Sequence, residues 1–205
     1  NEYTLNALLE SAVHVAHTRG NPDRGPDVGE VRKRLALVWE RLVGNSEQLF
    51  GTEDATLKNK IPCERTLPPV VPDRVSLNTA LKQWFIPSSA AVAAPQDRIR
   101  QKICSSLMPD SHIGGEALHE AKIFVSLMCT EYKVKPDTAT YNSLIRIAVR
   151  EAIEDASAGY GSASVMAAAE HIVSFLEEGA GELLLRPNVV TYTSLLVGYV
   201  QCAIG

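Results

Sequence analysis

One polar residue recurs at the same place in four similar stretches of the chain. Asparagine occupies this place three times, as Asn6, Asn78 and Asn142, and threonine occupies it in the last stretch, as Thr193. Asparagine is a mediocre helix former, yet each copy stands in an otherwise apolar helical segment. Its amide offers a hydrogen-bond donor and an acceptor together. The chemistry that these residues offer is hydrogen bonding, and their recurrence favours a functional role.

A second polar residue stands shortly before three of these positions, directly after a proline. These residues are Asp73, Asp137 and Asn188. Proline ends a helix because it lacks a backbone donor and biases the preceding residue away from α geometry. The Asp or Asn that follows can then cap the next helix. Because helix capping alone explains these three residues, they carry little functional information by themselves.

Other residues with reactive side chains do not form a recognisable catalytic or metal site. His14 and His17 lie three positions apart on one predicted helix, but no Cys, Asp or Glu cluster completes a metal site around them. The segment GYGSAS (159–164) lacks the strand and the Gly-Lys-Ser/Thr ending of a phosphate loop. Three acidic residues are read as a solvated helix end: Glu151, Glu154 and Asp155. The sequence therefore predicts a protein that is not an enzyme and that needs no cofactor or metal.

Composition limits the class of protein. The chain has 205 residues, 45% of them hydrophobic, and a formal net charge of −4. A protein that holds nucleic acid mainly by a basic surface needs an excess of Lys and Arg, so any nucleic acid must be bound locally. Four cysteines form no CxxC pair, which favours reduced thiols. The longest apolar stretch, near 194–205, is too short for a membrane span.

An internal repeat predicts the architecture. The phrase KPDTATYNSLI (135–145) returns as RPNVVTYTSLL (186–196), and VPDRVSLNTAL (71–81) and NEYTLNALL (1–9) fit the same template. The chain begins with asparagine rather than methionine, and its fourth copy is incomplete. We therefore expect a removed leader or an internal piece of a protein that continues further.

Between the copies, apolar residues recur at spacings of three and four, as on one face of a helix. The stripes are Val28, Val31, Leu35, Val38 and Leu42; Leu118, Ala121, Val125 and Met128; and Val165, Ala168, Ile172 and Phe175. Each unit is therefore a helical pair, and the prediction is an all-α solenoid of antiparallel pairs. The expected repeats run from about 2 to 73, 74 to 137 and 138 to 188, with a partial fourth repeat at 189–205.

Proline-rich and small-residue segments interrupt the repeats. We expect loops at 19–27, 46–72, 86–96 and 154–163, with a short helix near 97–107. A solenoid tolerates such insertions because they leave the contacts between neighbouring helices intact. Trp39 and Trp84 are expected in the helical core.

The repeated phrase Pro-Asp-x-x-Thr-Tyr-Asn-Ser-Leu-Ile, followed by a second helix, resembles the pentatricopeptide repeat. The third and fourth copies match best, and the resemblance covers about two-thirds of the chain as helical pairs. The insertions are a departure from the family, whose unit is about 35 residues.

The resemblance implies that each repeat faces one RNA base and reads it with two side chains. Carried over, the pairs are Asn6 with Asp73, Asn78 with Asp137, and Asn142 with Asn188, whereas Thr193 has no partner. The family's code then implies uridine, uridine and a pyrimidine leaning to cytidine. The residues in the family's base-wedging position are Tyr3, Val75, Ala139 and Val190.

Three functions follow from the resemblance. The first is a single-stranded RNA binder in organellar RNA processing, stability or translation. The second is a scaffold subunit of an organellar ribosome or similar complex, bound to ribosomal RNA and to ribosomal proteins. The third is the RNA-reading domain of a protein-only RNase P type enzyme. In each case we expect a mitochondrion or a plastid, and a fold alone does not choose among the three.

Overall fold

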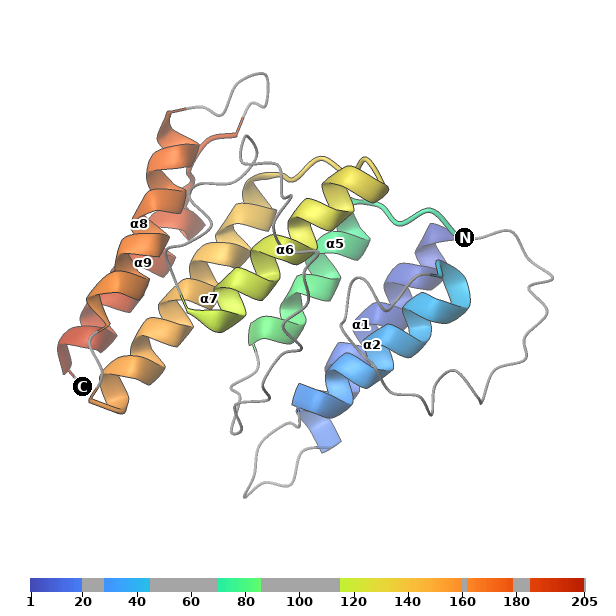
Figure 1. Cartoon of the computed structure of the whole chain (residues 1–205), viewed down its shortest axis with the longest axis horizontal. Coiled ribbons are helices and arrows are strands. Elements are labelled where there is room, and N and C mark those ends of the chain that lie inside the picture. Colours follow the sequence, from blue (N-terminus) through green and yellow to red (C-terminus); the bar gives the residue numbers. More distant parts are fainter. Residues whose placement is uncertain (20–27, 45–69, 86–114, 160–161, 179–184, 205) are drawn as a thin grey trace. The chain divides into compact units, whose positions relative to one another are not determined.

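A computed structural model of the chain describes residues 1–19, 28–44, 70–85, 115–159, 162–178 and 185–204 (Figure 1). These residues form seven α-helices and one short 3₁₀ helix, and they include no strand. The predicted all-α fold class is confirmed. No helix in this part of the chain is both long and apolar enough to cross a membrane.

The chain forms two compact units, Asn1–Asp97 and Arg98–Gly205. The boundary falls inside the expected second repeat, 74–137. The proposed pairing of Asn78 with Asp137 would join residues of different units, so that pairing and the repeat boundaries stay predictions.

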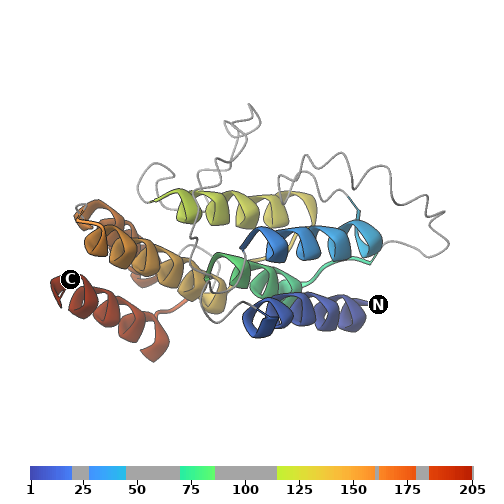
Figure 2. The same cartoon turned by 90° about the horizontal axis from the view of Figure 1, so that it is seen from below.

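Unit 1 is built around a helical pair with a third helix beside it. Its helices are α1 (Glu2–Arg19), α2 (Val28–Leu42), α5 (Arg74–Leu81) and the 3₁₀ helix η1 (Lys82–Phe85). Helix α2 runs antiparallel to α1, and α5 lies along α1 (Figures 1 and 2, blue and green). The apolar faces of these helices meet in a fully buried core of Leu5, Leu9, Leu35, Trp39, Leu77 and Leu81.

Unit 2 repeats this arrangement of antiparallel neighbours. Its helices are α6 (Glu116–Glu131), α7 (Thr138–Ser157), α8 (Ala163–Glu177) and α9 (Val189–Ile204). Helix α7 packs against the other three (Figure 1, orange) and supplies much of the core. The ring of Tyr141 on α7 lies 5.3 Å from the ring of Phe175 on α8. Burial raises the pKa of the Tyr141 hydroxyl, because the phenolate would lose its hydration.

The predicted stripes face these cores. Every residue of the stripe from Leu118 to Met128 is buried, as are Val31, Leu35, Val165, Ala168 and Ile172. The expected loop at 154–163 is partly wrong, because α7 continues to Ser157 and α8 begins at Ala163. An ion pair of 2.6 Å between Arg150 and Glu154, one turn apart, supports the extra turn.

Several sequence predictions concern residues that the structure does not describe. The expected loops at 19–27, 46–72 and 86–96, and the short helix near 97–107, lie mostly or wholly outside the described residues. Trp39 is buried as predicted, whereas the side chain of Trp84 is not among those described. The two described cysteines, Cys129 and Cys202, are not in disulfide bonds.

The prediction that Glu151 is solvated is wrong. Its carboxylate reaches from α7 to the start of α6, where it accepts hydrogen bonds from the backbone N–H groups of Ala117 (2.6 Å) and Leu118 (3.1 Å). Gly115 occupies the N-cap position of α6 and has no side chain with which to cap it. Glu151 therefore supplies from a neighbouring helix the acceptor that α6 lacks locally.

Helix α9 lies close to α7 and α8 at Gly198. A Cβ atom placed on this buried glycine would lie 2.9 Å from the Cγ2 atom of Val149 and 3.1 Å from the Cε atom of Met166. Glycine is unfavourable inside a helix, but here its missing side chain allows the helices to approach.

Enlarging Gly198 is expected to destabilise unit 2. In the variant Gly198→Leu, overpacking against Val149 should lower the free energy of unfolding by about 1 to 2 kcal/mol. Urea titration followed by circular dichroism measures this change. The variant Val197→Leu adds bulk at an exposed neighbour and serves as the control. An unchanged midpoint for Gly198→Leu would contradict the close approach.

Candidate functional site

Asn6 and Asp73, a predicted pair, are hydrogen-bonded in unit 1. Asn6 stands in the second turn of α1, and Asp73 is the N-cap of α5. The Asn6 Nδ2 atom donates to Asp73 Oδ1 at 3.2 Å and lies 3.4 Å from Asp73 Oδ2. Residues far apart in the sequence therefore form one polar site where the two helices meet.

A third residue, Ser76, completes this site. Its hydroxyl donates to the Asn6 amide oxygen at 2.6 Å, and its backbone N–H donates to Asp73 Oδ1 at 2.8 Å. The Asp73 N–H in turn donates to the Ser76 hydroxyl at 3.3 Å, which closes a capping box. We call Asn6, Asp73 and Ser76 the first triad.

Unit 2 contains a second triad of the same design, made of Asn142, Asn188 and Thr191. The Asn142 Nδ2 atom donates to Asn188 Oδ1 at 3.3 Å, and the Thr191 hydroxyl donates to the Asn142 amide oxygen at 2.6 Å. Asn188 Oδ1 also accepts from the Thr191 N–H at 3.2 Å, and the Asn188 N–H donates to the Thr191 hydroxyl at 3.0 Å. Two of the three predicted pairs are thus in direct contact.

The residues of the remaining predicted pair, Asn78 and Asp137, belong to different units. Asp137 caps α7, and its carboxylate accepts from the Thr140 N–H at 2.9 Å while the Asp137 N–H donates to the Thr140 hydroxyl at 3.2 Å. Its cap therefore matches the caps of the two triads. Asn78 lies in α5 of unit 1, and its pairing with Asp137 stays a prediction.

The two triads differ in the group that reaches solvent. Asn142 is only 7% exposed, whereas Asn188 is exposed and Asn6 and Asp73 are half-buried. In the first triad the outer group is a carboxylate, which can only accept. In the second it is an amide, whose Nδ2 atom makes no hydrogen bond to the rest of the described residues, because Asn188 uses its oxygen within the triad. The triads therefore offer opposite hydrogen-bonding groups to a ligand.

The first triad holds Asp73 ionised. Burial disfavours the charged carboxylate, but hydrogen bonds from Ser76 and Asn6 outweigh burial and keep the pKa of Asp73 below its ordinary value of 3.8. Since the folded pKa is the lower one, the stabilisation is present above pH 3.8 and is lost as the pH falls through the folded pKa. Asp73 is therefore an ionised acceptor at neutral pH.

Each of the four predicted wedge residues lies on the surface. Tyr3 is 77% exposed, Val75 53% and Val190 52%, and Ala139 is also exposed. Each stands one or two positions from the start of a helix and three residues before the recurring polar position. Three of the four therefore place a sizeable apolar side chain in solvent beside the polar site.

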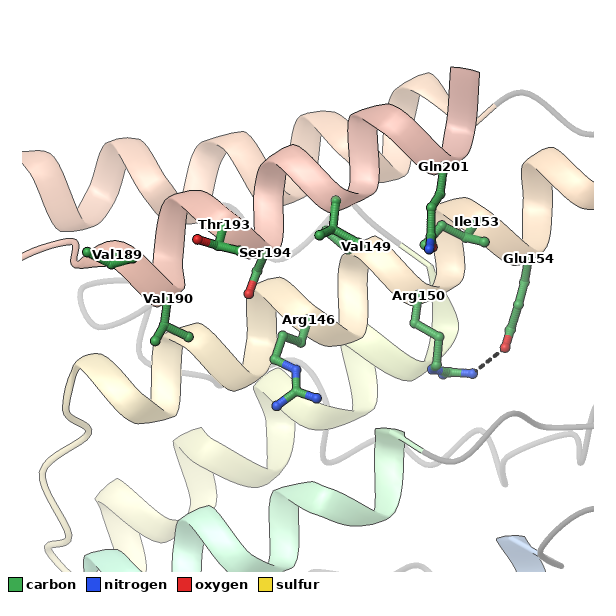
Figure 3. Close-up of a pocket in the computed structure, with 11 residues that line it drawn as sticks. Arg146, Val149, Arg150, Ile153, Glu154, Val189, Val190, Thr193, Ser194 and Gln201 are labelled. Atoms are coloured by element: carbon green, nitrogen blue, oxygen red, sulfur yellow. Dashed lines mark hydrogen bonds and ion pairs between the residues drawn. The ribbon is translucent and has the colours of Figure 1, made fainter. Parts of the chain in front are cut away.

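A groove of about 580 Å³ runs between α7 and α9 (Figure 3). Arg146 and Arg150 line it from α7, and Val190, Thr193 and Val197 line it from α9. Arg146 is exposed and follows Asn142 by one helical turn. Arg150 forms an ion pair with Glu154. The groove combines apolar walls with a basic rim, and it includes two predicted site residues, Val190 and Thr193.

Sequence reasoning missed three functional candidates, Ser76, Thr191 and Arg146. A signal for each was present. A hydroxyl residue stands three positions after each cap, the spacing of a capping box. Arg146 stands four positions after Asn142 and so lies on the same helix face. The contact of each hydroxyl with an asparagine of another helix has no local sequence signal.

His14 and His17 are predicted to lie on a helix surface, and the structure describes the side chain of His14 only. This side chain is exposed. Within the described residues, no group of three or more His, Cys, Asp or Glu side chains is placed to hold a metal ion.

Comparison of the chain with family models, with curated proteins and with solved structures finds no match. We therefore infer a function from the geometry of the two triads and of the groove.

Proposed function

We propose that the chain is a single-stranded RNA-binding protein of the pentatricopeptide type, acting in RNA processing, stability or translation in a mitochondrion or plastid. The observation that carries the proposal is the recurrence of one constellation in both units. In each, a helical asparagine is joined to the cap of a following helix, with an exposed wedge residue beside it. Ordinary capping requires the Asp or Asn but not the asparagine of the neighbouring helix.

The constellation suits the edge and the face of a base. A polar pair offers hydrogen bonds to the Watson–Crick edge, and an exposed apolar side chain offers a surface to the base face. The Asp73 carboxylate accepts, which suits the N3–H donor of uridine, and the Asn188 amide can donate, which suits the N3 acceptor of cytidine. The helical solenoid is part of this proposal, and the antiparallel neighbours within each unit support it.

The groove provides local positive charge in an acidic chain. Arg146 and Val190 both line the groove, so a phosphate at this guanidinium would place its base near the apolar wall (Figure 3). RNA binding by the chain then requires only a few basic contacts.

Replacing Arg146 tests the groove. The variant Arg146→Ala should weaken binding of single-stranded RNA about threefold to tenfold for every sequence, and it should reduce the slope of log affinity against log salt by about 1. Fluorescence anisotropy at several salt concentrations measures both quantities. Arg41→Ala removes an exposed arginine of α2 and serves as the charge-matched control. The same salt slope in Arg146→Ala and wild type would exclude a phosphate contact at Arg146.

A second candidate is a scaffold subunit of an organellar ribosome or similar complex. The exposed apolar surface of α9 favours it, since large exposed apolar patches mark interaction sites. The patch includes Val189 (80% exposed), Leu196, Val200 and Ile204.

Crosslinking in the cell separates the two candidates. The tagged protein is recovered after crosslinking, and its RNA and co-purifying proteins are identified from one sample. Short single-stranded footprints containing pyrimidines support the RNA-reading function. Recovery mainly of ribosomal RNA with a fixed set of ribosomal proteins would support the scaffold function instead.

A further inference from the structure

We infer that the hydroxyl groups of Ser76 and Thr191 set which hydrogen-bonding group Asn6 and Asn142 present to RNA, and thereby act as positioning residues for base selectivity. This inference rests on the proposed RNA-binding function. The hydroxyl–amide contacts are both 2.6 Å long, shorter than the 3.0 and 3.3 Å bonds with which the same hydroxyls close their capping boxes. Ser76 and Thr191 are fully buried, so water does not replace these bonds.

The orientation of each asparagine is fixed from the backbone outward. The N–H of Ser76 or Thr191 donates to the Oδ1 atom of the cap, so that atom must be an acceptor. The neighbouring asparagine must therefore turn its Nδ2 atom toward the cap, because the opposite orientation would place two oxygens in contact. Its amide oxygen then faces the hydroxyl.

The hydroxyl completes this order. The hydroxyl has two lone pairs and one hydrogen, and one lone pair accepts the hydrogen bond from the cap N–H. The hydrogen has two acceptors within reach, the cap Oδ1 atom at 3.0 Å in the first triad and 3.2 Å in the second, and the amide oxygen of Asn6 or Asn142 at 2.6 Å. The shorter contact favours donation to the amide oxygen. That oxygen is satisfied inside the triad, so each asparagine offers RNA only its remaining N–H. The outer acceptor or donor comes from Asp73 or Asn188.

Loss of the hydroxyl should release the amide. In Thr191→Val the shape of the side chain is kept, but the Asn142 oxygen loses its donor within a buried site. A buried carbonyl without a partner is unfavourable, and the cap Oδ1 atom still prevents the amide from simply exchanging its oxygen and nitrogen. The Asn142 side chain should therefore rotate out of the triad and present its oxygen to solvent. A base that was rejected for lack of an acceptor would then be tolerated.

The experiment measures base selectivity in wild type, Thr191→Ser and Thr191→Val. Anisotropy titrations use four single-stranded RNA oligonucleotides that differ in one nucleotide. Wild type and Thr191→Ser should discriminate alike, whereas Thr191→Val should discriminate at least about fivefold less between its best and worst base. Equal discrimination by Thr191→Val and wild type would overturn the inference. Ser76→Thr and Ser76→Ala repeat the comparison in unit 1, should Thr191→Val fail to fold.

A second readout separates this inference from the proposed function. NMR of the Asn142 side-chain amide, without RNA, reports whether its orientation and hydrogen exchange depend on the Thr191 hydroxyl. If wild type binds none of the oligonucleotides, the proposed function fails together with any role in selectivity. An Asn142 amide signal that is identical in wild type and Thr191→Val would show that the hydroxyl does not position the amide, whatever the RNA result.

Discussion

Replacing Glu151 with alanine is expected to lower the free energy of unfolding by about 2 to 3 kcal/mol, because two N–H groups at the start of α6 lose a charged acceptor. The acceptor comes from α7, so its loss weakens both the start of α6 and the contact between the two helices. Urea titration measures the change. The variant Glu154→Ala removes an exposed carboxylate one turn away, whose single ion pair with Arg150 is worth much less, and serves as the control.

A double-mutant cycle with Gly115 isolates the contact between Glu151 and the start of α6. A Cβ atom on Gly115 would lie 2.6 Å from the Glu151 carboxylate, so Gly115→Ala should displace the carboxylate and destabilise the protein by about 1 to 2 kcal/mol. In the Glu151→Ala background the same substitution should cost almost nothing. Additive effects of the two substitutions would contradict the contact.

The same carboxyl group predicts a pH dependence. Burial of Glu151 raises its pKa above the ordinary value of 4.5, against hydrogen bonds from Ala117 and Leu118 that act to lower it. Because the folded pKa is the higher one, the folded state binds the proton more tightly. The stability contributed by this linkage is present below pH 4.5 and is lost as the pH rises through the folded pKa. Relative to Glu151→Gln, wild type should therefore lose stability over that interval in urea titrations at several pH values.

Exchanging the outer groups of the triads is expected to exchange their base preference. Asp73→Asn converts a carboxylate that only accepts into an amide that can donate. On the proposed function, its preference at one nucleotide should move from uridine toward cytidine by about tenfold, which equals about 1.4 kcal/mol. Anisotropy titrations with oligonucleotides that differ only at that nucleotide measure the shift. Because Asn caps helices about as well as Asp, the fold should be retained.

The reciprocal variant is the control. Asn188→Asp makes the second triad resemble the first and should move its preference from cytidine toward uridine by a similar factor. General loss of affinity in both variants, without a change in preference, would mean that the triads stabilise the fold and do not read bases.

Much of the helical architecture is predictable because its signals are local. The apolar stripe from Leu118 to Met128 and the Pro-Asp step at Asp137 depend on residues close in the sequence, and both are found as expected. The predicted end of α7 is wrong because Gly159 and the serines around it suggested a loop, whereas the helix continues to Ser157.

Contacts between helices were predictable only where a repeat supplied the register. The resemblance to the pentatricopeptide repeat, applied to the aligned phrases, paired Asn6 with Asp73 and Asn142 with Asn188, and both pairs are hydrogen-bonded. The capping of α6 by Glu151 has no such register, because no repeated phrase marks it and it joins positions more than thirty residues apart. Its acidic neighbours made a solvated helix end the simpler interpretation.

Binding of the purified chain to a randomised single-stranded RNA pool tests the proposed function most directly. Retained RNA is sequenced for wild type and for the double variant Asn6→Ala/Asn142→Ala, after circular dichroism has shown equal helicity. Wild type should enrich pyrimidines at defined positions, and the double variant should bind the enriched RNA at least about tenfold more weakly. Retention without enrichment, or equal binding by wild type and the double variant, would contradict RNA reading by the triads.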